Sequence, residues 1–339
     1  MLNTLVTGAA GLVGGEVCAR LVERGHRVTA LVHKTPEIRC NDGQPVAVNR
    51  VVAGDVSQDR LGWSQGDFAA IAEDHDLVVH CAATVRFDLA EEDYRAVNVE
   101  GTRHALALAE AGGADFLHVS TAYVCGCRDG RITEDDPLPE TGFANGYEAS
   151  KAAGERLVRA STARWAIARP SIVVGAYRDG AIRQFDTTYA AFKLIAEGRV
   201  RHMPARVGAS LDFVPIDHVA GGIVALAEAM DEASGGTFHL VSGQPLPVER
   251  FTACIGAHAH FHEPELVPPE RFDPAQLPAL ERRLFRRVAG LYASYFQRDP
   301  HFDARRFRDV AGFACPLTGE AYVERLIGYC IQAGFLPRE

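Results

Sequence analysis

The sequence has no excess of positive charge. Its 339 residues include 35 lysines and arginines against 44 aspartates and glutamates, so the formal net charge is −9. Proteins held on nucleic acid by general electrostatic attraction carry the opposite balance, because the phosphate backbone is anionic. The composition therefore argues against nucleic acid as a partner and favours small-molecule chemistry.

The N-terminus lacks a long apolar run. Residues 1–6 lead directly into a glycine-rich segment, without the basic region and apolar stretch that mark a signal peptide or a membrane span. We therefore expect a cytoplasmic protein that makes no membrane contact.

A metal-binding cysteine pattern is also missing. Among the eight cysteines only Cys125 and Cys127 are close neighbours, and no second ligand pair follows at the spacing of a zinc site. We expect no metal site, and thiols that are reduced and mostly packed.

What the sequence does contain is a repeated alternation of strand-like and helix-like segments. Short apolar runs that indicate strands lie at 2–6, 28–32, 76–80, 116–119 and 165–168. Apolar residues recur three or four apart, as in helices, near 12–24, 93–111, 147–162 and 217–229. Such alternation predicts an α/β fold with a Rossmann doubly wound parallel sheet, covered by helices on both faces.

The alternation weakens beyond about residue 175. Nine prolines between Pro204 and Pro278 interrupt short helical and extended pieces there. We therefore predict an NAD(P)-binding domain over residues 1–175, to which segments around 208–242 return. Residues 176–339 are expected to form mainly a smaller C-terminal subdomain that binds substrate.

A glycine-rich turn follows the first predicted strand and opens the first predicted helix. It reads T-G-A-A-G-L-V-G from Thr7 to Gly14. Glycine allows a tight turn and a close approach of backbone N–H groups to a pyrophosphate, whose charge the helix N-terminus favours. Such turns also serve merely to pack a helix on a strand, but this placement favours nucleotide binding. The predicted contacts are Gly8, Ala10, Gly11, Leu12, Val13 and Gly14.

The ends of the second and third strands bear on the choice of cofactor. The second ends in Leu31-Val32-His33-Lys34, where a carboxylate would accept hydrogen bonds from ribose and repel a 2′-phosphate. No acid is present, so NADPH is favoured and NADH is the alternative; Lys34 could also be simply a solvated residue. Asp55 and Val56 follow Gly54, where a further strand beyond those given above is expected to end. They are candidates to contact adenine, and a helix N-cap is the competing role for Asp55.

Tyr147 and Lys151 form the candidate proton-transfer pair. At the start of a predicted helix, a spacing of four places the phenol and the ammonium on one face. A nearby cation stabilises phenolate, so we expect the pKa of Tyr147 to lie below its usual value of about 10. A string Y-x-x-x-K is common by chance, but this one follows five strand-helix steps after the glycine-rich turn.

Two further polar residues are candidates for the same site. Thr121 follows the predicted strand at 116–119, at the sheet edge where open α/β folds bind ligands, and could polarise a substrate carbonyl. An ordinary turn role is the alternative for Thr121. Asn98 lies within a helical pattern, where asparagine is intrinsically unfavourable. We expect it to form a structural hydrogen bond beneath the site.

Together these features resemble the extended short-chain dehydrogenase/reductase superfamily. Four strings are similar to its thioester reductase and fatty acyl-CoA reductase branch: His80 to Phe87 (H-C-A-A-T-V-R-F), Val119 to Val124 (V-S-T-A-Y-V), Arg169 to Val173 (R-P-S-I-V) and Asp212 to Ala220 (D-F-V-P-I-D-H-V-A). The resemblance implies that Thr121, Tyr147 and Lys151 are a catalytic triad. It also implies that the cofactor is flanked by Ala82, Ala83, Thr84, Pro170, Ser171, Ile172 and Val173. The chain departs from the branch at His33-Lys34, where an arginine is expected.

The resemblance implies an NADPH-dependent reductase that converts an acyl thioester, carried by CoA or a carrier protein, to an aldehyde or further to an alcohol. Thr121 and Tyr147 would stabilise the oxyanion, while Lys151 would bind the nicotinamide ribose. Without a carrier region, the chain would act on a delivered substrate. The identity of the acyl group, the physiological direction and the oligomeric state stay open.

Competing functions use the same residues. The first is oxidoreduction of a free carbonyl or hydroxyl compound, such as a steroid-like or dihydroflavonol-like substrate. A sugar-nucleotide epimerase or dehydratase ranks lower, because that branch has an Asp-Glu pair where this chain has Ala122 and Tyr123. A non-catalytic dinucleotide sensor ranks lower too, because such proteins tend to lose the Tyr-Lys pair.

Overall fold

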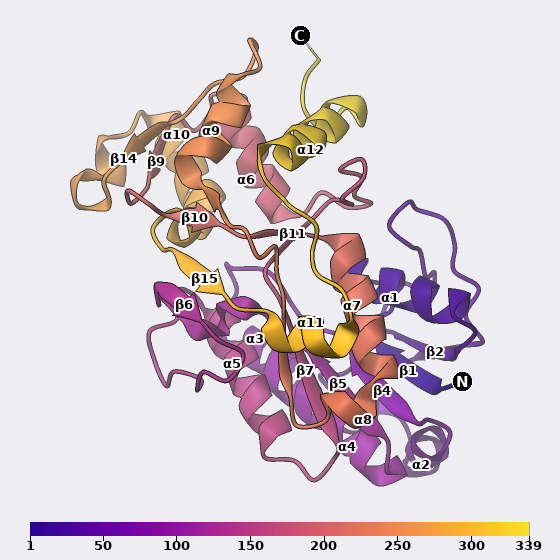
Figure 1. Ribbon diagram of the computed structural model, residues 1–339. Coiled ribbons are helices and arrows are strands. Elements are labelled where there is room, and N and C mark those ends of the chain that lie inside the picture. The colour runs from indigo at the N-terminus through magenta and orange to yellow at the C-terminus, as the bar shows by residue number, and fades with distance from the viewer. Residues whose placement is uncertain (339) are drawn as a thin grey trace.

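A seven-stranded parallel sheet lies at the centre of the computed structural model, which describes residues 1–338 (Figure 1). Its strands are β1 (Asn3–Thr7), β2 (Arg27–Val32), β3 (Arg50–Ala53), β4 (Leu77–His80), β5 (Asp115–Val119), β7 (Trp165–Pro170) and β12 (Thr237–Leu240). They are ordered β12-β7-β5-β4-β1-β2-β3, so the direction of winding reverses at β1. Each predicted strand coincides with one of these, and the predicted α/β fold is confirmed.

Helices cover both faces of the sheet, as the alternation predicts. On one face lie α1 (Leu12–Glu23), α7 (Ile216–Glu228), α8 (Met230–Ala233) and α11 (Arg305–Ala311); on the other lie α2 (Gln65–Glu73), α4 (Gly101–Gly112) and α5 (Gly146–Arg159). Leu21 of α1 and Val219 of α7 are fully buried in the first layer. Ala105 of α4 and Val158 of α5 are fully buried in the second. Two apolar layers therefore fix the sheet that carries the site.

The predicted helix at 93–111 is longer and less regular than expected. It begins with α3 (Glu91–Tyr94), widens into a π-helical turn over Arg95–Glu100 and continues as α4. In a π-helical turn the backbone hydrogen bonds join residues five apart, whereas in an α-helix they join residues four apart. Such turns are frequent at functional sites. Asn98 lies in this turn.

The rest of the chain forms a subdomain of short elements at the carboxyl ends of the strands (upper part of Figure 1). Its helices are α6 (Thr187–Ala196), α9 (Val248–Gly256), α10 (Ala279–Arg287) and α12 (Glu320–Gln332). Its strands and those of the connecting loops are β6 (Gly130–Ile132), β8 (Ile172–Val174), β9 (His202–Pro204), β10 (Ser210–Leu211), β11 (Phe213–Pro215), β13 (Leu246–Pro247), β14 (Glu265–Val267) and β15 (Pro300–Phe302). They pair two by two as β6 with β15, β8 with β11, β9 with β14 and β10 with β13.

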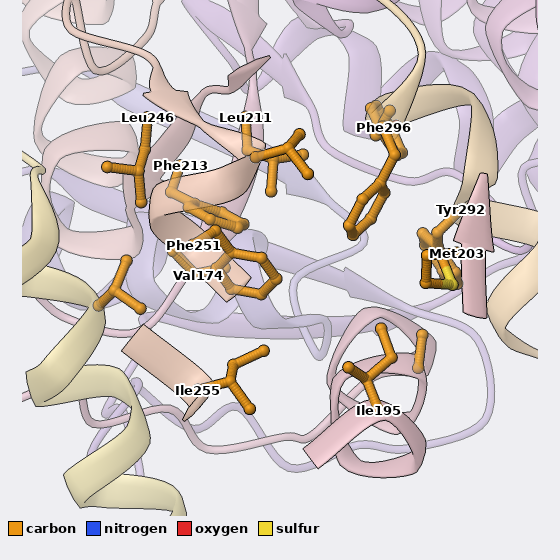
Figure 2. Close-up of a cluster of buried hydrophobic side chains, with 14 of the residues drawn as sticks. Val174, Ile195, Met203, Leu211, Phe213, Leu246, Phe251, Ile255, Tyr292 and Phe296 are labelled. Carbon is orange, nitrogen blue, oxygen red and sulfur yellow. The ribbon is translucent and has the colours of Figure 1, made fainter. Parts of the chain in front are cut away.

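Short helical turns complete the chain, at Asp59–Gly62, Ala122–Cys125, Pro269–Arg271, Pro274–Gln276 and Ala289–Phe296. The subdomain has an apolar core of its own, in which Val174, Ile195, Phe213, Phe251 and Phe296 take part (Figure 2). Between its segments the chain returns to the sheet, because α7 packs on α1 and β12 pairs with β7.

All eight cysteines are unpaired within residues 1–338, as expected. In the same residues, no helix is long and apolar enough to cross a membrane, and no three histidine, cysteine, aspartate or glutamate side chains are grouped so that they could hold a metal ion.

Candidate active site

A cleft of about 330 Å³ lies where the subdomain faces the carboxyl ends of the central strands. Most of the predicted site residues line it: Gly8, Gly11, Leu12, Val13, Gly14, Ala83, Thr121, Tyr147, Lys151, Pro170, Ser171, Ile172 and Val173. The structure thus brings together segments that are more than 160 residues apart in the sequence. Open α/β sheets bind ligands at this edge, beside the strand where the winding reverses.

The glycine-rich turn is packed too closely for side chains. Gly8 has a φ of +64°, and a Cβ on it would come within 2.7 Å of the Ala82 backbone. A Cβ on Gly14 would lie 2.3 Å from the Gly8 carbonyl oxygen. Gly11 is the N-cap of α1 and offers no capping side chain, so the helix N-terminus opens into the cleft. These residues fit a dinucleotide pyrophosphate.

The residues predicted at the ends of β2 and β3 stand apart from the cleft lining. His33 and Lys34 are exposed, and His33 Nε2 lies 3.5 Å from Asp55 Oδ2. Asp55 is not a helix N-cap, which corrects the alternative role considered for it: it accepts hydrogen bonds from the amide and hydroxyl of Ser57. Burial alone would raise the pKa of Asp55, but these hydrogen bonds and the nearby His33 outweigh it and lower the pKa. Val56 is buried against Gly101.

Lys151 reaches the cleft from α5 and is almost completely buried. Its Nζ donates to the carbonyl oxygen of Val119 at the end of β5, over 2.8 Å. Burial lowers the pKa of Lys151 to about 8, and the neighbouring Glu155 and Cys81 limit the fall. The ammonium is therefore held at the sheet edge, and its pKa of about 8 means that it loses its proton just above neutral pH.

Tyr147 departs from the sequence-based expectation. Burial raises the pKa of its phenol, and a hydrogen bond with Thr121 opposes the rise. The predicted lowering of this pKa by Lys151 is therefore wrong for the free protein, because the effect of burial is the largest one on this phenol. A protonated phenol is suited to donate a hydrogen bond to a substrate oxygen.

Thr121 has the turn role that was considered for it, and it also lies in the cleft. Its Oγ1 accepts a hydrogen bond from the Tyr123 amide and caps the turn at Ala122–Cys125, and it donates to the Pro170 carbonyl oxygen over 3.3 Å. The same hydroxyl lines the cleft beside Tyr147. The turn therefore holds the hydroxyl in place.

Asn98 lies beneath the cleft and does not line it. Its Oδ1 accepts from the Thr84 amide over 2.8 Å, and its Nδ2 donates to the Thr84 carbonyl oxygen and to Ser150 Oγ. Asn98 therefore ties the segment after β4 to helix α5. Ala82, in that segment, packs on Gly8 and donates its amide to Thr7 Oγ1. Of the predicted site residues, Ala10 also lies off the cleft lining.

Sequence reasoning missed the aromatic side chains around Tyr147. Phe87 stacks on Tyr147 with ring centroids 5.4 Å apart, and its ring also contacts Tyr292 and Tyr295. Phe87 is the last residue of the family-like string from His80 to Phe87, so the sequence did contain a signal that pointed to it. Tyr292 and Tyr295 lie in a part of the chain without regular periodicity and carried none. The cleft is also lined by Cys81, Val85, Val119, Ser120, Gln184, Asp186 and Thr188.

An apolar cavity of about 70 Å³ adjoins the cleft inside the subdomain. The two share four lining residues: Ile172, Thr188, Tyr292 and Tyr295. Figure 2 shows Phe213 and Phe251 facing Phe296 and Ile195 across the subdomain core, and all four line the cavity. Among the described residues no charged side chain lines it. A polar cleft thus continues into an apolar space.

A buried ion pair connects the subdomain to the helix that carries Tyr147. Arg298 donates to both carboxylate oxygens of Glu148, the residue that follows Tyr147. Its guanidinium also contacts the rings of Tyr123 and Tyr295, 4.6 and 4.9 Å from their centroids. The pair therefore fixes α5 against the wall of the cleft.

Comparison with known proteins supplies the family. Residues 6–223 match an NAD-binding family described as male sterility protein. The chain is 29% identical over 279 residues to fatty acyl-CoA reductase 1 of Xenopus laevis, covering 66% of this chain and 54% of that protein. It is also 29% identical over 279 residues to the hybrid PKS-NRPS synthetase LUC5 of a Fusarium species, covering 76% of this chain and 7% of that protein.

Among solved structures, the chain is similar to the terminal R domain from the myxalamid PKS-NRPS biosynthetic pathway. The TM-score is 0.82 at 27% identity, and the match covers 99% of this chain and 92% of that domain. The similarity therefore extends over both the sheet and the subdomain, although the chain spans only about half of the reductase relative.

Proposed function

Because the chain belongs to the NAD-binding family described as male sterility protein, we propose that it is an NADPH-dependent reductase that converts an acyl thioester into an aldehyde. The family is an extended short-chain dehydrogenase/reductase family, and the chain is related to fatty acyl-CoA reductases and to terminal reductase domains. The substrate would be carried by CoA or by a carrier protein. Residues 1–175, with 208–242, are assigned to the cofactor and the remainder mainly to the substrate.

The observation that carries the proposal is the apolar cavity that adjoins the cleft containing Tyr147. An acyl thioester has a polar carbonyl at one end of an apolar chain, and the site offers hydroxyl donors in the cleft and an apolar space next to it. Burial of a hydrocarbon chain is worth about 0.8 kcal/mol per methylene. A sugar nucleotide would leave its hydroxyl groups unpaired in such a space.

The proposed chemistry assigns one task to each polar side chain. Tyr147 donates a hydrogen bond to the thioester oxygen as it gains negative charge, and the Thr121 hydroxyl would turn from the Pro170 carbonyl oxygen to donate beside it. Such contacts are stronger in the transition state than in the ground state. Lys151 binds the nicotinamide ribose and its charge favours the developing oxyanion. A bound reduced nicotinamide would supply the hydride to the thioester carbon. The C–S bond of the resulting hemithioacetal would then break, which leaves the aldehyde and releases the carrier as a thiol with a proton from solvent.

The preference for NADPH rests on the end of β2. Lys34 is an exposed cation there, and the segment from Leu31 to Lys34 contains no carboxylate to repel a 2′-phosphate. His33 pairs with Asp55, which leaves Lys34 as the cation of that segment that is free to meet a phosphate.

The proposal is tested by a substrate screen. Purified protein is incubated with acyl-CoA thioesters, acyl-pantetheine thioesters and free aldehydes, each with NADPH and with NADH, and products are identified by mass spectrometry. We expect NADPH oxidation with a thioester and release of an aldehyde; alcohol as the final product would add a second reduction. Turnover of free carbonyl compounds alone would reject the thioester and leave the competing oxidoreductase function.

A further inference from the structure

An arginine of the subdomain stands against the glycine-rich turn. Arg183 lies in the segment between β8 and α6, and its Nη2 donates to the Gly11 carbonyl oxygen over 2.9 Å and to the Ala10 carbonyl oxygen over 3.3 Å. The residue after it, Gln184, lines the cleft, as does Asp186. The guanidinium therefore stands against the turn at the N-terminus of α1, and the residues that follow it in the chain line the cleft.

This guanidinium has no counter-ion in the described part of the chain. No carboxylate there lies within ion-pair distance of Arg183, and its buried Nε has no hydrogen-bond partner. Burial lowers the pKa of Arg183, which reflects the cost of holding a charge away from water. The deeply buried Arg169 and Arg298, by contrast, are each paired with a glutamate. Arg183 thus forms no ion pair in the described residues, and Glu16 is the carboxylate that acts on its charge from farther away.

The position of Arg183 is fixed by its own backbone. Asn41, in the segment after β2, accepts from the Arg183 amide and donates to the Ala181 carbonyl oxygen. The Asn41 amide in turn donates to Glu16 of α1. These bonds join the subdomain segment to the nucleotide-binding helix, so the cation is held beside the turn before any ligand binds.

We propose that Arg183 binds a phosphate group of the dinucleotide. The first amides of α1 and the Arg183 guanidinium would form two sides of one anion site, and the arginine would gain the charged acceptor that it lacks here. The pyrophosphate is common to NADH and NADPH, whereas the 2′-phosphate occurs in NADPH alone. The assignment goes beyond the proposed reaction, because it depends on the cofactor and on no particular substrate.

The test measures dissociation constants of NADPH, NADH and adenosine for the wild-type protein and for Arg183→Gln, by calorimetry or by quenching of tryptophan fluorescence. Arg178→Gln is the matched control, because Arg178 is an exposed arginine of the same segment. Thermal unfolding of each variant shows that it is folded. None of these readouts requires turnover, so a failure here is distinct from a failure of the thioester proposal.

We expect Arg183→Gln to raise the dissociation constant of NADPH at least about tenfold, the scale of one charge-assisted hydrogen bond, and Arg178→Gln to leave it unchanged. An equal loss for NADH assigns the pyrophosphate, and a loss confined to NADPH assigns the 2′-phosphate. Adenosine, which has no phosphate, should bind both proteins alike. Unchanged affinity for both dinucleotides, or an equal loss for adenosine, would overturn the proposal.

Discussion

The sheet domain and the subdomain meet at one cleft, yet they are built on different principles. The sheet domain has long parallel strands between two layers of helices, whereas the subdomain is made of two-stranded ladders and short helical segments around its own core. The family match ends at residue 223, before most of the subdomain. Regular structure thus accompanies most of the part that the family model matches, and irregular structure accompanies most of the part beyond it.

The two regions also offer different chemistry to a ligand. On the sheet side the cleft presents helix amides, the Lys151 ammonium and the Thr121 and Tyr147 hydroxyls. On the subdomain side it continues into an apolar cavity without charged lining residues in the described chain. The cleft thus has a polar side and an apolar side on different regions of the chain, and the Arg298–Glu148 pair is one of the contacts that join these regions.

Removal of Arg298 should have the largest effect on stability. Arg298→Met leaves the fully buried Glu148 carboxylate without its partner, so we expect a loss of about 3–5 kcal/mol in the free energy of unfolding. Urea denaturation of the variant and of Arg287→Met, which removes an exposed arginine, makes the comparison. A loss below about 1 kcal/mol, the scale of a surface pair, would show that the pair does not hold the two regions together.

Tyr147→Phe should separate catalysis from binding within the sheet domain. It removes the donating hydroxyl and keeps the ring that stacks on Phe87, so we expect kcat to fall at least about a hundredfold. The dissociation constant of the cofactor, measured by fluorescence, should stay unchanged. Turnover near that of the wild-type protein would reject the assigned role of Tyr147.

Filling the apolar cavity should weaken only the binding of the acyl chain by the subdomain. Ala191 of α6 lines the cavity, and Ala191→Leu adds three carbon atoms to a space of about 70 Å³. Loss of room for two or three methylenes costs roughly 2 kcal/mol, so we expect KM for a medium-chain thioester to rise about thirtyfold while a short-chain one is spared. Ala190→Leu, on the same helix but off the cavity lining, is the control. Equal effects on both chain lengths would place the acyl chain elsewhere.

The affinity for the cofactor should depend on pH through Lys151, which belongs to the sheet domain. Because burial lowers the pKa of Lys151 to about 8, this side chain is cationic below that pH and loses its charge as the pH rises through it. We expect the dissociation constant of the cofactor to rise by up to about tenfold between pH 7 and pH 9. In Lys151→Met the curve should be flatter, and a curve as steep as that of the wild-type protein would assign the titration to another group.

The smallest effect is expected at the outer surface of α10. Arg283, Arg286 and Arg287 are exposed on this helix, which leads directly into the turn that carries Tyr292 and Tyr295. Glutamate at these three positions and at Arg282 should raise KM for a carrier-bound thioester roughly fivefold, on the order of 1 kcal/mol of lost attraction to an acidic carrier. A short free aldehyde should be unaffected. Equal effects on both substrates, or none on either, would show that the helix does not contact the carrier.

Local patterns in the sequence were sufficient to predict the sheet domain. Strand runs, helical periodicity and the glycine-rich turn each depend on neighbouring residues, and the Tyr147 and Lys151 spacing predicted two side chains that do share the cleft. The subdomain gave no comparable pattern, because its short strands pair with partners far away in the sequence. Tyr292 and Tyr295 reach the cleft only through that long-range packing.

The pKa of Tyr147 could not be predicted from spacing for a related reason. Four residues on a helix place Lys151 on the same face, but they do not determine what its ammonium contacts. In the structure the Val119 carbonyl at the end of β5 accepts a hydrogen bond from the Lys151 ammonium. Burial has the largest effect on the pKa of the Tyr147 phenol. Both effects depend on the packing of α5 against the sheet and not on the helix sequence.

Transfer of the label from deuterated NADPH tests the central claim most directly. The protein is given a medium-chain acyl thioester and NADPH that carries deuterium at the reactive nicotinamide carbon, and the products are analysed by mass spectrometry. The account predicts an aldehyde with one deuterium on its carbonyl carbon, or an alcohol with two on the same carbon, together with free thiol. Oxidised cofactor without labelled aldehyde or alcohol, or label found only in products of free carbonyl compounds, would contradict it.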